Sequence, residues 1–287
     1  MTGTNSGASS MNYHEIFYDV SERIATVTLY RPDKLNAWTA RMGQEVRHAM
    51  EAADRDDEAR VIVLTGAGKG FCAGADMSLL TGVAEGGAIS EAAQALRHEA
   101  AAHTNEQVPP DFQGTYSYFP SLRKPVIAAI NGHSVGLGLV IALYCDLRFA
   151  STEAKFSTAF ARRGLIAEFG TAWMLPRLIG LSNALDLLLS ARTLGAAEAL
   201  RIGLVNRVFP VDSFVEDVRT YARELATQVS PRSLAAIKQQ VYRGLFQTLQ
   251  EATESAEQAM LESLQSEDFK EGLAHFYEKR APSFTGR

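Results

Sequence analysis

The chain has few cysteines and no long apolar run. Only two of its 287 residues are cysteine, Cys72 and Cys145, so nothing in the sequence suggests a disulfide framework. No apolar stretch approaches the roughly 20 residues that a membrane-spanning helix needs. The opening residues, MTGTNSGASS, are small and polar, without the charged-then-apolar order of a signal peptide. We therefore expect no membrane span, a cytoplasmic location and a disordered tail over residues 1–12.

An excess of positive charge is also missing. The chain has 28 Lys and Arg against 33 Asp and Glu, which gives a formal net charge of −5 and a pI near 5.7. Phosphate backbones bind clustered Lys and Arg, so no nucleic-acid partner is expected. The sequence has no HExxH motif and no Cys–His cluster, so no metal site is expected either. We interpret His98 and His103 as residues on a helix surface.

What the sequence does have is an alternation of strands and helices. Apolar, β-branched runs predict paired strands in IFYDV and RIATVTLY, and buried strands in ARVIVLTGAG, KPVIAAI, DLRFAS and AKFST. Helical patterns begin at Thr39, a suitable N-cap, and at LGLVIALYCD, and one more is expected around Ser90 to His103. After Gly170 the chain becomes helical and ends in two or three long amphipathic helices. This order predicts an α/β core over residues 13–210 and a helical region over 211–287.

One glycine-rich stretch invites a nucleophile interpretation. The residues GHSVG, 132–136, fit the G-x-S-x-G pattern of a serine nucleophile between a strand and a helix. That chemistry also needs an acid and then a histidine downstream, and the only downstream histidine is His275, in a predicted C-terminal helix. No HGGG-type oxyanion segment precedes Ser134. We therefore favour Ser134 as a small residue in a tight turn.

Two glycine turns suggest a different device. TGAGKGFCAGAD and NGHSVGLG each follow a buried strand and lead towards a predicted helix, whose first N–H groups have no internal partner. Two such N–H groups that converge on one point would form an oxyanion hole.

The chain resembles the enoyl-CoA hydratase/isomerase (crotonase) family over nearly its whole length. The resemblance rests on ordered segments: RPDKLNA, VIVLTGAGKGFCAGADM, RKPVIAAINGHSVGLG, CDLRFAS, RRGLIAEFGTAWMLPRLIG, ARTLGAAEALRIGLVNRV and FYEKRAPSF. It implies an α/β fold, a crotonase-like spiral of ββα units with a helical C-terminal trimerisation region. It also implies an acyl-CoA substrate, as in fatty-acid metabolism, with coenzyme A bound as part of that substrate and no separate cofactor. The assembly expected is a homotrimer or a dimer of trimers.

The resemblance carries roles onto named positions. The two oxyanion N–H groups would belong to Ala75 and Leu137. Residues expected at the CoA moiety or the substrate are Lys34, Leu35, Ala73, Asp76, Met77, Phe276 and Lys279, the last two within or between subunits. Residues expected to line the acyl pocket are Tyr116, Tyr118, Val140, Phe160 and Trp173. Simpler interpretations remain open: a helix N-cap for Asp76, core packing for the tyrosines and Phe276, and a solvated lysine for Lys279.

The acid of the site is the point where the chain departs from family hydratases. The two positions that carry glutamates there are Val140 and Phe160 here, and both are apolar. Glu168 remains, among Leu165, Ile166, Phe169 and Trp173. A carboxylate in apolar surroundings should have a raised pKa, which suits a proton shuttle. Alternatively, Glu168 would simply place a favourable negative charge near the start of the helix after Gly170.

These residues favour an isomerase that moves a double bond from Δ3 to Δ2 with Glu168 as the single proton shuttle. A hydratase, hydrolase or lyase acting on an acyl-CoA remains open, as does a non-catalytic CoA-ester-binding subunit. A serine hydrolase using Ser134 is the least favoured. The sequence does not name the acyl chain.

Overall fold

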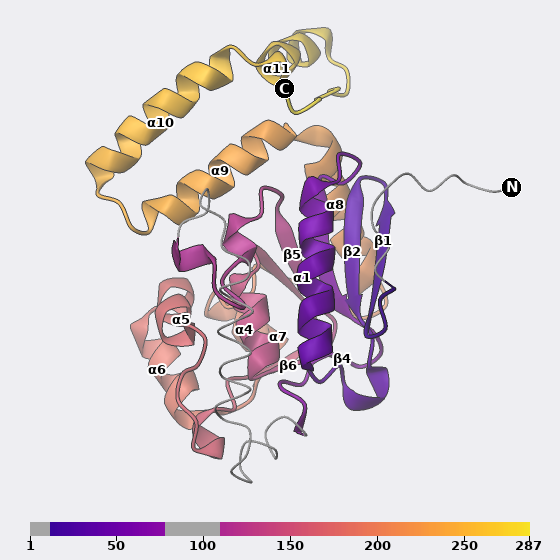
Figure 1. Cartoon of the computed structure of the whole chain (residues 1–287), viewed down its shortest axis with the longest axis vertical. Helices are drawn as coiled ribbons and strands as arrows, with labels where there is room; N and C mark the ends of the chain where they lie inside the picture. Colours follow the sequence, from indigo (N-terminus) through magenta and orange to yellow (C-terminus); the bar gives the residue numbers. More distant parts are fainter. Residues whose placement is uncertain (1–11, 78–109) are drawn as a thin grey trace, which may run out of the picture.

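The computed structural model of the chain describes residues 12–77 and 110–287. A sheet of strands in the order β1-β2-β3-β5-β7-β10 forms its centre (Figure 1). β1 and β2 form the expected antiparallel pair, and all other neighbours in this sheet are parallel. The strands are β1 (Ile16–Ser21), β2 (Ile24–Leu29), β3 (Val61–Gly66), β5 (Val126–Ile130), β7 (Leu147–Ser151) and β10 (Arg207–Phe209).

A second, smaller sheet is formed by strands that alternate in the chain with those of the large sheet. Its strands, in the order β4-β6-β8-β9, are β4 (Gly70–Cys72), β6 (His133–Val135), β8 (Lys155–Ser157) and β9 (Leu194–Gly195). β3, β5 and β7 are each followed, after a short turn, by the next strand of the small sheet. The repetition of this step produces the predicted succession of strand pairs and helices.

Helices cover both faces of the large sheet. Within the described residues they are α1 (Ala40–Arg55), α4 (Leu137–Tyr144), α5 (Thr171–Ile179), α6 (Leu181–Ser190), α7 (Ala196–Arg201), α8 (Phe214–Gln228), α9 (Pro231–Gly244), α10 (Leu249–Leu264) and α11 (Glu267–Glu278). α1 and α8 lie on opposite faces (Figure 1). Successive residues of a strand point to opposite faces, so Ile62 packs in the cluster with α1 and Val63 in the cluster with α8. A strand buried on both faces is apolar throughout, as VIVL is.

Local sequence signals set the helix boundaries. The Thr39 hydroxyl accepts a hydrogen bond from the Met42 N–H (3.0 Å), which confirms Thr39 as the N-cap of α1. All residues of α4 are buried, as expected of a helix that is apolar all round. The helix expected around Ser90 to His103 lies outside the described residues, as does nearly all of the predicted tail over residues 1–12.

The C-terminal region contains four helices, α8 to α11, where the sequence predicted two or three. The prediction missed the breaks at the caps: Pro231 at the start of α9, the capping box of Thr248 and Glu251 before α10, and Ser266 before α11. The division of the chain at residue 211 stays a prediction, and α8, just after it, packs against the large sheet.

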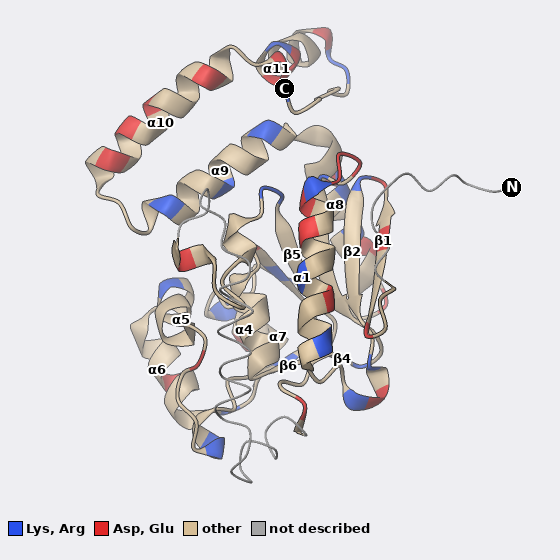
Figure 2. Ribbon diagram, in the orientation of Figure 1, with Lys and Arg blue, Asp and Glu red and all other residues tan. Residues whose placement is uncertain are grey.

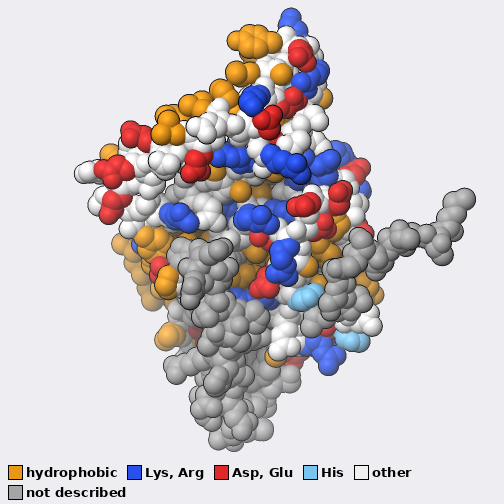
Figure 3. Space-filling model, turned by 45° about the horizontal axis from the view of Figure 1, so that its top comes forward, with side chains coloured by type: hydrophobic (Ala, Val, Ile, Leu, Met, Phe, Trp, Pro, Cys, Tyr) orange, Lys and Arg blue, Asp and Glu red, His pale blue; other side chains and the backbone are white. Residues whose placement is uncertain are grey.

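The last helices form an arm with an uncovered apolar edge. α9 carries only basic charges and α10 only acidic ones (Figure 2), and the two helices pack together. Hydrophobic side chains lie along the upper edge of the molecule (Figure 3). The exposed large hydrophobic residues of α10 and α11 are Leu249, Met260, Leu261, Leu264, Phe269, Leu273, Phe276 and Tyr277. Within the described residues, no helix combines the length and apolar character needed to cross a membrane.

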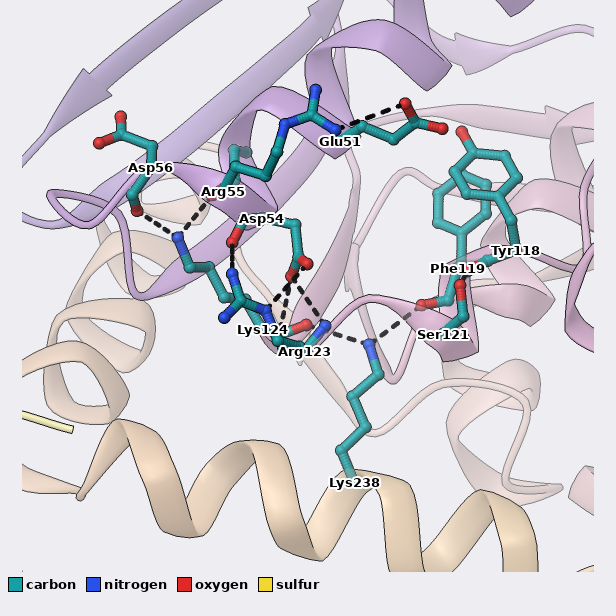
Figure 4. A network of polar contacts seen from close by, with 11 residues as sticks. Glu51, Asp54, Arg55, Asp56, Tyr118, Phe119, Ser121, Arg123, Lys124 and Lys238 are labelled. Carbon is teal, nitrogen blue, oxygen red and sulfur yellow. Dashed lines mark hydrogen bonds and ion pairs between the residues drawn. The ribbon is translucent and has the colours of Figure 1, made fainter. Parts of the chain in front are cut away.

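A buried ion pair holds this arm to the core. The Lys238 ammonium of α9 lies 2.8 Å from the Asp146 carboxylate, and their side chains are only 6% and 16% exposed. The same ammonium donates to the carbonyls of Phe119 (3.1 Å) and Lys124 (3.0 Å), as Figure 4 shows. Asp146 also accepts the Val126 N–H at 2.6 Å. Asp146 thus has a structural role, and the pair joins α9 to the start of β5.

We predict that Lys238→Met lowers the free energy of unfolding by about 3–5 kcal/mol, because the Asp146 carboxylate stays buried without its cation. Lys270→Met is the matched control. Its ion pair with Glu267 is about two-thirds exposed on both sides (64% and 65%), so its loss should cost under about 1 kcal/mol. Chemical denaturation of both variants measures the difference, and equal effects would contradict this account of the anchor.

Candidate active site

The turn after β4 lies directly against the turn that begins α4. Gly74 has a φ of +103°, and a Cβ atom there would lie 3.0 Å from the Val135 carbonyl oxygen and 3.9 Å from the Leu137 nitrogen. Glycine alone combines this backbone conformation with so close an approach. The two glycine turns singled out in the sequence therefore meet in space.

A second glycine brings the helix itself onto the strand. A Cβ atom at Gly138 would lie 2.1 Å from the carbonyl oxygen of Cys72. The first turn of α4 thus rests on the backbone of β4. Cys72 is fully buried, and burial raises the pKa of its thiol to about 12.

In the described part of the chain, backbone geometry leaves two N–H groups, those of Ala75 and Leu137, without a backbone acceptor where the two glycine turns meet. The Trp38 N–H donates to the Gly74 carbonyl (2.8 Å) and the Asp76 N–H donates to the Trp38 carbonyl (2.9 Å). Because backbone groups alternate along an extended segment, the Ala75 N–H points away from Trp38. Leu137 begins α4, so its N–H has no acceptor within the helix. Within residues 12–77 and 110–287, neither N–H donates to any acceptor.

The predicted CoA-contacting residues before α1 lie beside the first turn. Lys34 ends a short 3-10 helix and is exposed, and the carbonyl of Leu35 accepts the Ala73 N–H at 3.0 Å. Asn36 is fully buried with a φ of +56°, and its amide donates to the Gly70 carbonyl at 2.7 Å. This amide fastens the segment to β4, so Lys34, Leu35 and Ala73 share one surface.

Asp76 and Met77 extend this surface. The Asp76 carboxylate pairs with Arg31 at 2.8 Å, and Met77 is 62% exposed. The N-cap interpretation of Asp76 concerns a helix beyond residue 77, which lies outside the described residues.

Glu168 stands in the turn just before α5. Burial raises the pKa of its carboxyl from the ordinary 4.5, in the direction the sequence predicted. Among the described residues its carboxylate has no hydrogen-bond or ion-pair partner. α5 begins at Thr171, and Glu168 stands two residues before its N-cap, Gly170, so a favourable charge near the start of this helix stays an open interpretation of Glu168. The predicted apolar pocket is incomplete in the single chain, because Ile166 is 79% exposed and Phe169 is 38% exposed.

Aromatic contacts bring the Glu168 turn to the two N–H groups. The ring of Phe169 meets Tyr116 edge to face at 4.8 Å, and Tyr116 meets Trp38 at 6.1 Å. The Tyr144 hydroxyl, at the end of α4, donates to the Phe169 carbonyl at 2.8 Å. Phe169 has a φ of +49°, held by these contacts. Phe169, the neighbour of Glu168, thus contacts two elements. One is Tyr116, which packs on Trp38, whose backbone bridges Ala75; the other is Tyr144, in the helix that begins at Leu137.

The remaining predicted acyl-pocket residues fall into two groups. Val140 and Phe160 are buried in the core cluster, and the Phe160 ring lies 4.0 Å from the Cβ position of Gly136. Trp173 is partly buried and stacks on Phe246 at 5.4 Å. Tyr118 instead packs under the Arg47 guanidinium of α1 (4.3 Å), so it fits the core-packing interpretation.

Phe276 and Lys279 do not approach these residues within one chain. α11 lies at the top of the molecule, far from β4 and β6 (Figure 1). Phe276 is 73% exposed and Lys279 is the left-handed C-cap of α11.

A serine nucleophile at Ser134, the least favoured alternative, gains no support from the structure. Ser134 lies within β6, rather than in the turn where we placed it, and it is fully buried. Within the part of the chain that the structure describes, its hydroxyl has no hydrogen-bond partner. His275 is in α11, where its ring contacts Phe284. A substrate could not reach this hydroxyl.

Several residues that build the site were not singled out in the sequence. Trp38, Asn36, Tyr144 and Phe246 have no motif of their own. Only Asn36, in the stretch LNA, could have been recognised from the sequence, because asparagine adopts a left-handed backbone conformation more readily than most residues. His98 and His103 lie outside the described residues. Elsewhere in the described part, no group of three or more His, Cys, Asp or Glu is placed to hold a metal ion.

We predict that Gly138→Ala destabilises the protein by about 3 kcal/mol, because the new methyl group must push α4 off the β4 backbone. Gly244→Ala, with no atom within 4 Å of its Cβ position, is the control and should leave stability equal or higher. Urea unfolding compares the two. Equal stability of both variants would show that the two turns are not closely packed.

The chain is similar to known proteins over nearly its whole length. The family model described as enoyl-CoA hydratase/isomerase matches residues 19–287. A protein of Rhodobacter capsulatus described as a probable enoyl-CoA hydratase is 40% identical over 279 residues, covering 96% of this chain and 100% of the relative. The 1,2-epoxyphenylacetyl-CoA isomerase of Escherichia coli K12 is 32% identical, covering 95% of this chain and 98% of the relative.

A 4-chlorobenzoyl coenzyme A dehalogenase-2 of an Arthrobacter species is 34% identical, covering 96% of this chain and 95% of the relative. Among solved structures, the enoyl-CoA hydratase of Bacillus anthracis superposes with a TM-score of 0.85 at 29% identity, covering 96% of this chain and 100% of that one. The fold is therefore the spiral α/β fold that the resemblance implied. The chain belongs to the enoyl-CoA hydratase/isomerase family of acyl-CoA-processing enzymes.

Proposed function

We propose that the protein isomerises 3-enoyl-CoA thioesters to 2-enoyl-CoA thioesters, with Glu168 as the only proton shuttle. The observation that carries the proposal is the Glu168 carboxylate, whose pKa is raised by burial and which has no partner among the described residues. Its neighbour Phe169 contacts Tyr116, next to Trp38, and Tyr144 of α4. Within the described residues, the Ala75 and Leu137 N–H groups donate to no acceptor. A group poised in this way exchanges protons more readily near neutral pH than an exposed glutamate.

The two N–H groups have a clear task in this reaction. Removal of a proton from C2 of the substrate moves negative charge onto the thioester oxygen. Donors on Ala75 and Leu137 would stabilise that charge without reorganising, because the glycine turns already fix them. They would act as the oxyanion hole.

The proton balance needs one base and no other reactant. The Glu168 carboxylate takes a proton from C2, and the electrons pass through the C3–C4 double bond and the thioester as a dienolate. The protonated Glu168 then returns a proton to C4, which leaves the double bond between C2 and C3. Nothing is gained or lost, so water is not required.

The apolar residues at Val140 and Phe160 support this choice over hydration. Water addition in family hydratases uses two carboxylates at these positions, and here both side chains are buried and apolar. No acid is available there to hold or activate water.

Coenzyme A would lie along the surface of Lys34, Leu35, Ala73, Asp76 and Met77, as part of the substrate. Phe276 and Lys279, remote in one chain, would reach this surface from a neighbouring subunit of a homotrimer or a dimer of trimers. The uncovered apolar edge of the arm supports such an assembly. Light scattering tests it, and an active monomer would refute it. The cytoplasmic location also stays a prediction.

Hydration is the second candidate, because relatives such as that of Rhodobacter capsulatus carry the name of a hydratase. Incubation with 3-enoyl-CoA and 2-enoyl-CoA, followed by mass spectrometry and chromatography, separates the two. Isomerisation leaves the mass unchanged and moves the double bond, whereas hydration adds the mass of one water. Hydration as the only activity would overturn the isomerase proposal.

We predict that Glu168→Gln lowers kcat by at least about 100-fold while acyl-CoA binding is retained, since the amide keeps the shape but cannot take a proton. Glu153→Gln, at an exposed glutamate, is the control and should leave kcat unchanged. Burial raises the pKa of Glu168, so the base form is lost as pH falls through a value above 4.5, and the acid limb of wild-type kcat/KM should lie above that value. Normal turnover by Glu168→Gln would make Glu168 a structural residue.

Stability gives an independent check of the same residue. A carboxyl with a raised pKa in the folded state stabilises the protein at low pH, and this contribution is lost as pH rises through the folded-state pKa. At neutral pH the Glu168→Gln protein should therefore melt at the same temperature as wild type or higher. In mildly acidic buffer the difference should shrink.

A further inference from the structure

Two groups of aromatic contacts lie on neighbouring stretches of the chain, one at the Glu168 turn and one at the C-terminal arm. Phe169 meets Tyr116 at 4.8 Å, Trp173 lies four residues after Phe169, and Phe112 lies four residues before Tyr116. Phe246, in the connection between α9 and α10, closes the set. Its ring stacks on Trp173 at 5.4 Å and meets Phe112 edge to face at 5.9 Å. We call these five residues the aromatic frame.

The frame begins at the proposed reaction centre and leads away from it. Tyr116 also contacts Trp38, whose backbone bridges Ala75. An acyl chain whose thioester sat at Ala75 and whose C2 faced Glu168 would continue along these rings. Phe246 stands at the far end of this path.

The outer rings of the frame remain accessible. Phe112 and Tyr116 are buried, whereas Phe169 is 38% exposed, Trp173 is partly buried and Phe246 is 50% exposed. These three offer an apolar surface of the kind that lines sites for small apolar groups.

Phe246 is held in place from two directions. Trp173 is fixed by the Arg177 guanidinium, 3.9 Å from its ring, and so presents a steady surface to Phe246. On the other side, Phe246 follows α9, which is anchored to the core by the Lys238–Asp146 ion pair and by the bonds from Lys238 to the Phe119 and Lys124 carbonyls, the latter two drawn in Figure 4. A residue on a rigid support can select among ligands by size.

We propose that Phe246 is a specificity-determining residue that limits the length of the acyl chain by closing the aromatic frame. The inference rests on the proposed function, since it takes an acyl-CoA bound at Ala75, Leu137 and Glu168. It assigns the choice of substrate to the C-terminal arm, which no motif in the sequence connects to the acyl group.

The test uses saturated butyryl-CoA and decanoyl-CoA, which bind without reacting, and measures both dissociation constants by calorimetry. Phe246→Ala should shift the ratio of the two constants at least about tenfold in favour of decanoyl-CoA, because methylenes gain room where the ring stood. Phe246→Leu, which keeps an apolar side chain and guards against misfolding, should shift the ratio in the same direction by less. Leu249→Ala, 85% exposed and close by in the chain, is the control and should leave the ratio within about twofold.

The outcomes are distinct. If wild type binds both esters and neither Phe246 variant moves the ratio, the inference is overturned while the proposed function stands. If the ratio shifts as expected but no 3-enoyl-CoA is isomerised, Phe246 keeps its role and the proposed reaction falls. If wild type binds neither ester, both are overturned.

Discussion

The close approach of two backbones, α4 at Gly138 and β4 at Cys72, sets the geometry on which the site depends. With the Cβ position of Gly138 only 2.1 Å from a carbonyl oxygen, no other residue fits without displacement. This contact places the start of a helix beside the end of a neighbouring strand. Both N–H groups of the proposed oxyanion hole come from that junction, so their spacing is a property of main-chain packing and hardly depends on side-chain identity.

Side chains supply what the main chain cannot. The junction provides two N–H donors but no side chain that exchanges protons. Val140 and Phe160, at the two positions where family hydratases carry glutamates, are apolar and buried. The proposed proton shuttle, Glu168, lies in a separate turn. The Tyr144 hydroxyl donates to the Phe169 carbonyl of this turn, and the Phe169 ring packs against Tyr116. Partial burial there raises the pKa of the carboxyl. Ionising this carboxyl at neutral pH therefore lowers the stability of the fold, and the surrounding contacts offset this loss.

The sequence predicts this fold well where the signals are local. Apolar runs predicted the buried strands, Thr39 marked the start of α1, and glycines marked both turns. It predicted less where a contact joins distant segments. Lys238 and Asp146, or Phe246 and Trp173, show no spacing that announces their pairing. The error at Ser134 has the same origin, because G-x-S-x-G describes a turn and says nothing of what covers the hydroxyl. The predicted number of C-terminal helices was too low for another reason. The amphipathic pattern continues across the capping residues that separate one helix from the next.

The placement of the tryptophans has an optical consequence. The chain has only two, and both touch the proposed acyl path: Trp38 through Tyr116, and Trp173 through Phe246 and the Arg177 cation. Indole emission responds to the polarity around the ring and to nearby charge. When tryptophan is excited selectively over the nine tyrosines, the emission of the protein therefore comes only from these two rings along the proposed path. Occupancy of that site can be followed in solution without a label, and the signals of the near and far ends of the path can be separated by replacing one tryptophan at a time.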